Sequence, residues 1–206
     1  MFNQSMLSFS KDNQSLKIHF EHPNAIGFLS NAIKEGVLHR PIGSTVVIMC
    51  IGTDRSTGDS LGPLVGTNLS DKLHLPYIYG TLNNPVHAVN LEETLNKVSD
   101  EIINPFIIAI DACLGHHSSI GDVTIAKGSL KPGAGVKKVL PEVGNYHITG
   151  VVNVGGFMEY FVLQNTRLNL VFQMADIISR SIAIALRSTQ QFGISTLPVL
   201  NQRELP

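Results

Sequence analysis

Continuous apolar runs and alternating patterns divide the chain into candidate strands. STVVIMCIG (44–52) and FIIAI (106–110) are unbroken and rich in β-branched residues, which is typical of strands covered on both faces. LKIHFEH (16–22), YIYG (77–80) and ITGVVNV (148–154) predict further strands. GDVTIAKG (121–128) alternates in the way we expect of an exposed edge strand.

Apolar residues at helical spacing lie between these strands. The spacing predicts helices over 25–37, 60–73 and 91–103, and two more between 157 and 186 with a break near 165–169. The stretch 130–144 is rich in glycine and proline and predicts a loop. Strands that alternate with helices predict an α/β fold, a three-layer α/β/α sandwich around a mostly parallel sheet. We expect one domain over 1–206, irregular at 1–10 and 189–206.

Composition and charge narrow the class of protein. The 206 residues are 43% hydrophobic, which suits a sizeable core, and the net charge of −1 gives no basic surface for nucleic acid. The charged fraction of 15% is low and favours some protein contact, such as a homo-oligomer. We find no secretory signal and no apolar run of the roughly 20 residues that span a bilayer. We therefore expect a cytoplasmic protein without membrane contact.

Two aspartates follow the two buried runs. Asp59 lies in GTDRSTGDSLGP (52–63), where it could cap a helix that begins at Ser60 with Pro63 in its first turn. Asp111 follows FIIAI, where a carboxylate needs partners or a raised pKa. Both positions lie where sites form in such sheets, at the carboxyl ends of strands.

The two carboxylates could share one crevice if their strands are neighbours. A close pair would hold one proton between its members, so that one could deprotonate water while the other polarises a carbonyl. The same oxygens could instead bind a divalent metal. A nucleophilic Cys113 paired with His116 or His117 is a weaker alternative, because no third orienting group is evident.

Three ordered motifs resemble the germination protease family, spore endopeptidases of an atypical aspartic type. The matches are TGDSLGP at 57–63, IDA at 110–112 and PGAGV at 132–136. The resemblance implies that Asp59 and Asp111 are catalytic and that no cofactor is needed. It also implies that residues of the first and third motifs bind substrate: Thr57, Gly58, Gly62, Pro132, Gly133 and Gly135.

Across nearly its whole length the chain is similar to the YyaC family of short sporulation proteins, within a superfamily that includes the hydrogenase maturation endopeptidases. That resemblance implies a phosphorylase/hydrolase-like three-layer fold. In the maturation enzymes two acidic residues, which correspond to Asp59 and Asp111, bind nickel of the substrate, and His147 is the candidate for a third metal ligand here.

Three functional hypotheses follow from these resemblances. The first is a sporulation-associated peptidase-like hydrolase that acts on a protein substrate, such as small acid-soluble spore proteins, in the forespore or spore core. The second is a catalytically inactive regulatory or binding protein that retains the protease fold. The third is a metal-dependent maturation endopeptidase.

Overall fold

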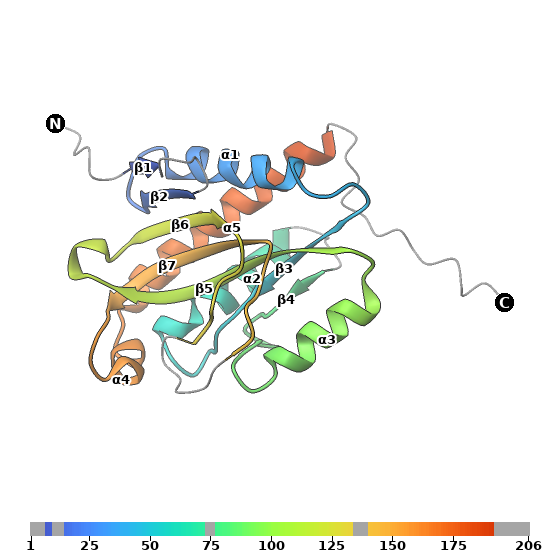
Figure 1. Ribbon diagram of the computed structural model, residues 1–206. Coiled ribbons are helices and arrows are strands. Elements are labelled where there is room, and N and C mark those ends of the chain that lie inside the picture. The colour runs from blue at the N-terminus through green and yellow to red at the C-terminus, as the bar shows by residue number, and fades with distance from the viewer. Residues whose placement is uncertain (1–6, 10–14, 73–76, 134–139, 192–206) are drawn as a thin grey trace.

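A mixed sheet lies between two helical layers in the computed structural model, which describes residues 7–9, 15–72, 77–133 and 140–191 (Figure 1). Within the described residues the sheet has seven strands in the order β1-β2-β6-β7-β5-β3-β4. Their bounds are β1 Leu7–Phe9, β2 Ser15–His19, β3 Thr45–Cys50, β4 Ile78–Tyr79, β5 Pro105–Gly115, β6 Asp122–Lys127 and β7 Tyr146–Val154. The strands β4, β3, β5 and β7 pair in parallel, whereas β6 and β1 run against their neighbours. Five of these seven strands therefore point the same way.

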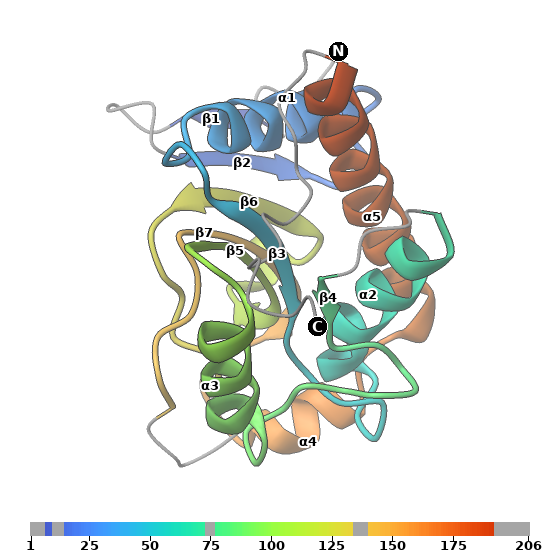
Figure 2. The ribbon, with the colours of Figure 1, turned by 90° about the vertical axis from the view of Figure 1, so that its right-hand side faces the viewer.

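The helices cover the two faces of the sheet unequally. One face carries α1 (Ala25–Leu38), α2 (Leu61–Lys72) and α5 (Leu168–Gln191), and the other carries α3 (Leu91–Glu101) (Figure 2). The short α4 (Glu159–Gln164) contacts the 3-10 turn η2 (Gly58–Ser60), and a second 3-10 turn, η3, spans His117–Ser119. This arrangement confirms the three-layer α/β/α sandwich.

Strand β3 shows why the run from Val46 to Cys50 is apolar at every position. All six residues of β3 are buried, and the five after Thr45 alternate between two cores. Val46, Ile48 and Cys50 join the core under α1, α2 and α5, whereas Val47 and Met49 join the core under α3. A strand with helices on both faces has no side facing solvent, so no polar alternation remains.

Helix α5 is long and apolar enough, by length and composition alone, to cross a membrane. Half of its apolar window is buried within the fold, where α5 packs along α1 and α2. Residues such as Met174, Ile178 and Ile182 lie in the core beneath the sheet. A core helix of a globular domain has these properties.

Several sequence predictions need correction in the described residues. Strand β6 lies between β2 and β7 in the interior of the sheet, so its alternation does not mark an edge. The segments 1–10 and 189–206 are not wholly irregular, because Leu7–Phe9 form β1 and α5 continues through Gln191. Asp59 does not precede a helix as its N-cap but lies inside η2, whose own N-cap residue is Thr57.

Candidate functional site

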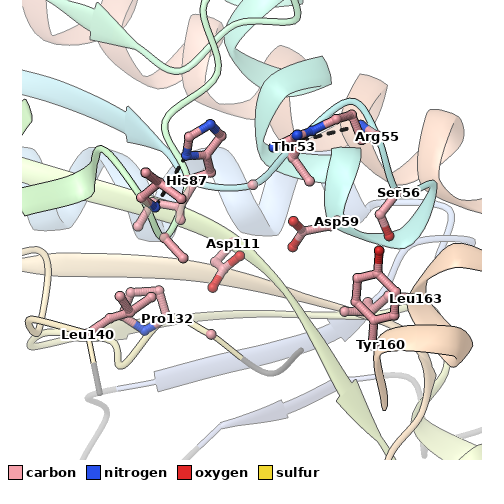
Figure 3. Close-up of a pocket in the computed structure, with 15 residues that line it drawn as sticks. Thr53, Arg55, Ser56, Asp59, His87, Asp111, Pro132, Leu140, Tyr160 and Leu163 are labelled. Atoms are coloured by element: carbon pink, nitrogen blue, oxygen red, sulfur yellow. Dashed lines mark hydrogen bonds between the residues drawn. The ribbon is translucent and has the colours of Figure 1, made fainter. Parts of the chain in front are cut away.

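A pocket of about 320 Å³ opens where the parallel strands end, and both aspartates line it (Figure 3). The β3 end and its following turn supply one wall, and the segment after β4 supplies another. The remaining walls come from Pro132, Gly133 and Leu140 and from α4. The lining residues are Ile51, Gly52, Thr53, Arg55, Ser56, Asp59, His87, Ala88, Val89, Asp111, Pro132, Gly133, Leu140, Tyr160 and Leu163.

Asp111 is held by the sheet itself. We expected it just past the end of a strand, but β5 continues through Gly115, and Asp111 lies opposite Thr149 of β7. Its neighbour β3 stops one residue earlier, where Cys50 pairs with Ile110. Asp111 is therefore the first residue of β5 that has lost β3 on one side, and its 6% exposed side chain faces the pocket.

Asp59 is held by a turn rather than a strand. Gly52 leaves β3 at a φ of 141°, a conformation that favours glycine, and the Thr53 N–H then donates to the Asp59 backbone carbonyl at 3.1 Å. A Cβ on Gly62 would overlap the Ile51 carbonyl oxygen, so α2 begins close against the end of β3. These close backbone contacts place the Asp59 carboxylate beside that of Asp111 in the pocket (Figure 3).

The electrostatic surroundings of the two carboxyls differ. Burial raises the pKa of Asp59, although the Thr53 amide and the charge of His87 oppose that rise. Burial raises the pKa of Asp111 well above its ordinary value, and the negative charge of Asp59 raises it further. A hydrogen bond from the Ala112 amide partly lowers this pKa. The pair therefore favours one proton, carried by Asp111, with Asp59 as the ionised member.

Ser56, His87 and Tyr160 are among the pocket residues that the sequence did not predict. His87 lies in the segment between β4 and α3. Its backbone N–H donates to Asn90 Oδ1 at 2.8 Å, and its ring Nδ1 accepts from the Val89 backbone N–H at 3.4 Å. The Gly52 N–H donates to the Val86 carbonyl at 2.8 Å, which fixes this segment beside β3. The stretch NNPVHAVN carries no motif, so only the fold brings His87 to the carboxylates.

The predicted substrate-binding residues divide into two groups. Pro132 and Gly133 line the pocket, whereas Thr57, Gly58 and Gly62 do not. Gly58 and Gly62 instead allow close packing against α4 and β3, and Thr57 accepts from the Ser60 hydroxyl at 2.7 Å. Gly135 lies outside the described residues.

The predicted third metal ligand is not in the pocket. The His147 ring, on β7, is bound to the Gly128 carbonyl through Nδ1 at 2.9 Å. No three His, Cys, Asp or Glu side chains in the described part of the chain are grouped to hold a metal ion. The donor arrangement of Asp59, Asp111 and His147 therefore does not fit a three-ligand metal site.

The cysteine alternative is likewise not supported by the geometry. Cys113 does not line the pocket, and burial together with the charge of Asp111 raises its pKa to about 11. His116 and His117 are exposed beyond the end of β5. A thiol that stays protonated and has no histidine partner in a pocket is a poor nucleophile.

Comparison with a solved structure agrees with this fold. The [NiFe] hydrogenase maturation protease HycI from Thermococcus kodakarensis superposes with a TM-score of 0.51 at 18% sequence identity. The match covers 75% of this chain and 99% of HycI. At this identity the likeness confirms the predicted fold of the maturation endopeptidases.

Sequence comparison gives the family. The uncharacterized protein YyaC of Bacillus subtilis (strain 168) is 56% identical over 152 residues, which are 73% of this chain and 74% of YyaC. This confirms the predicted similarity to YyaC, whereas the resemblance to germination protease stays a prediction. Residues 17–181 match the family model described as "Protein of unknown function (DUF1256)". The chain belongs to the DUF1256 family.

Proposed function

We propose that this protein is a peptidase-like hydrolase in which Asp59 and Asp111 activate water against a peptide bond of a protein substrate. One observation carries the proposal: the buried carboxyl of Asp111 and the half-buried carboxyl of Asp59, which have unequal surroundings, line one pocket at the carboxyl ends of parallel strands. Sites of α/β proteins form at this edge, and paired carboxyls with separated pKa values suit acid and base roles.

The unequal pKa values assign the roles. The ionised Asp59 accepts a proton from water, and the water oxygen attacks the carbonyl carbon. The protonated Asp111 donates a hydrogen bond, and then its proton, to the carbonyl oxygen. The tetrahedral intermediate collapses when the nitrogen takes the proton held by Asp59 and a hydroxyl returns a proton to Asp111, so that both groups regain their starting states. His87 supports the ionised state of Asp59.

The comparisons support the class of reaction rather than its target. HycI, a hydrogenase maturation protease, shares the fold. The predicted resemblance to germination protease makes small acid-soluble spore proteins the first candidate substrates. Their cleavage would place the protein in the forespore or spore core. YyaC is uncharacterized, so the similarity to it adds no activity.

The test is cleavage of purified small acid-soluble spore proteins and of a diverse synthetic peptide library, read by mass spectrometry. Asp59→Asn and Asp111→Asn should each lower the rate by about 10²-fold or more, because each removes one proton-transfer group. Asp54→Asn, on the exposed part of the same turn, is the matched control and should cleave like the wild type.

Two outcomes would count against hydrolysis by the pair. Cleavage that survives in both variants would mean that other groups carry the reaction. A folded wild type that binds peptides but cleaves none would instead favour the non-catalytic binding protein.

A further inference from the structure

Ser56 has an unusual hydroxyl. Its side chain is buried, with 8% exposed, and it lines the pocket beside Asp59. Among the described residues its Oγ is the buried side-chain polar atom without any hydrogen-bond partner. By contrast, the buried Ser30 and Ser60 hydroxyls both donate to backbone carbonyls. A buried polar group without a partner costs stability, so its retention in a pocket points to a ligand that supplies the partner.

An exposed apolar surface begins next to this serine. Phe157, Met158, Tyr160 and Phe161 are 82%, 53%, 55% and 53% exposed, and we call them the α4 apolar cluster. The rings of Tyr160 and Phe161 contact each other at a centroid distance of 5.8 Å. Met158 has a φ of 52°, an uncommon conformation for a large side chain, and it immediately precedes α4. A strained backbone that presents apolar side chains to solvent is typical of a functional surface.

Tyr160 joins the two features. It belongs to the α4 apolar cluster and also lines the pocket, and the Ser56 side chain extends toward it (Figure 3). Leu140 lines the pocket on the side away from α4 (Figure 3), and Val89, which is 84% exposed, also lines the pocket. The two carboxylates lie between these walls (Figure 3). A chain that crosses them would therefore meet apolar side chains on both sides of the reacting bond.

We propose that Ser56 and the α4 apolar cluster form a substrate subsite for an extended polypeptide with large apolar side chains next to the scissile bond. This inference rests on the proposed function and specifies its substrate class. The Ser56 hydroxyl binds a backbone amide or carbonyl of the substrate, while Tyr160 and its neighbours cover the adjacent apolar side chain. A polypeptide supplies the polar and the apolar contact within one residue, which is why we favour it over other occupants.

Other occupants fit less well. The segment 155–164 contains no lysine or arginine, so it lacks the charges that bind nucleic acid. Its Glu159 carboxylate already accepts from the Gly156 N–H at 3.2 Å. A second copy that covered Tyr160 permanently would also cover the wall of the pocket, which a working hydrolase needs open.

Binding can be measured without cleavage in the Asp59→Asn/Asp111→Asn double variant. The probe is a positional-scanning library of fluorescein-labelled peptides, read by fluorescence anisotropy. We expect the best binders to carry Phe, Leu or Met at neighbouring positions. Adding Ser56→Ala or Phe161→Ser to the double variant should weaken these binders by about tenfold, a loss typical of one well-placed contact. Ile42→Ser, at a fully exposed apolar residue before β3, is the matched control and should change nothing.

Thermal unfolding separates a binding role from a structural one. The free Ser56→Ala protein should melt at the wild-type temperature or above it, because the substitution removes a buried group without a partner. A lower melting temperature without any loss of peptide binding would make Ser56 a structural residue and overturn the proposal. The proposal would also be overturned if the wild type were a dimer that Phe161→Ser dissociates, because a second copy would then cover this surface. It would likewise be overturned if the wild type sedimented with phosphatidylglycerol vesicles and Phe161→Ser abolished this, because the surface would then bind a membrane.

The outcomes also separate this subsite from the proposed hydrolysis. Apolar peptides that bind but are never cleaved by the wild type would support the subsite and contradict the hydrolase. Peptides that are cleaved without preference for apolar neighbours, at rates unchanged by Ser56→Ala and Phe161→Ser, would support the hydrolase and overturn the subsite.

Discussion

Gly58→Ala tests whether the first motif serves packing or substrate contact. A Cβ at Gly58 would lie 2.8 Å from both Leu163 Cδ2 and Thr166 Oγ1 and 3.0 Å from the Leu163 carbonyl oxygen. Carbon atoms prefer a separation of about 3.5–4.0 Å, so Leu163 would have to retreat by roughly 0.7 Å or more. Leu163 and Thr166 are 4% and 6% exposed, and Thr166 Oγ1 already donates to the Val162 carbonyl at 2.9 Å. Neither side chain can therefore move away freely.

Overpacking of this kind costs about 1–3 kcal/mol of unfolding free energy. In a chain of this size that corresponds to a melting temperature lower by roughly 2–12 °C, which differential scanning calorimetry resolves. The control is Gly27→Ala in α1, where the new Cβ meets the side chain of Asn24, which is exposed and can rotate. Alanine in a helix is favoured over glycine by up to about 1 kcal/mol, so this variant should melt at or above the wild-type temperature. Equal melting temperatures for wild type and Gly58→Ala would refute the packing argument.

Three further predictions concern titration and reactivity. Asp111→Asn should raise the unfolding free energy at neutral pH. Because the pKa of Asp111 is higher in the folded than in the unfolded protein, wild-type stability falls as the pH rises above the unfolded pKa. Urea unfolding at several pH values should show a smaller fall in the variant. Cleavage should decline at low pH as Asp59 becomes protonated and at high pH as Asp111 loses its proton, and a pH–rate profile without either limb would contradict the assigned roles. Iodoacetamide should alkylate Cys113 far more slowly in the native protein than after unfolding, since its pKa is about 11, and mass spectrometry can follow the adduct.

The main layers of the fold could be predicted because their patterns are local. Apolar runs and helical spacing located β3, α1 and α3 close to their observed bounds, whereas β5 and α5 continue past the predicted ends at 110 and 186 to Gly115 and Gln191. Strand order could not be read in this way. Whether β6 lies at an edge depends on β2, a strand about 100 residues earlier, pairing beside it. Such pairing leaves no trace in the alternation of a single strand.

The candidate site, too, could be predicted only where the signal is local in the sequence. Asp59 and Asp111 could be located because each follows a buried run, and their shared pocket follows from the parallel pairing of β3 and β5. The pocket histidine, His87, could not be located, because the expected spacing pointed to His147. His87 reaches the pocket only through the hydrogen bonds of its segment. Gly58 and Gly62 do not line the pocket, and the sequence could not distinguish them from Gly133, because close packing and substrate contact impose the same requirement for a missing side chain.

The carboxyls of Asp59 and Asp111 are held by backbone segments that differ in how firmly they are bonded. Asp111 is part of a long strand bonded to β7, whereas Asp59 rides on a single 3-10 turn whose Gly58 lies directly against Leu163 of α4. A displacement of α4 would therefore press on this turn through Leu163, whereas the pairing of β5 with β7 would hold Asp111 in place. Substitutions that shift α4 should therefore change the position of Asp59 more than that of Asp111.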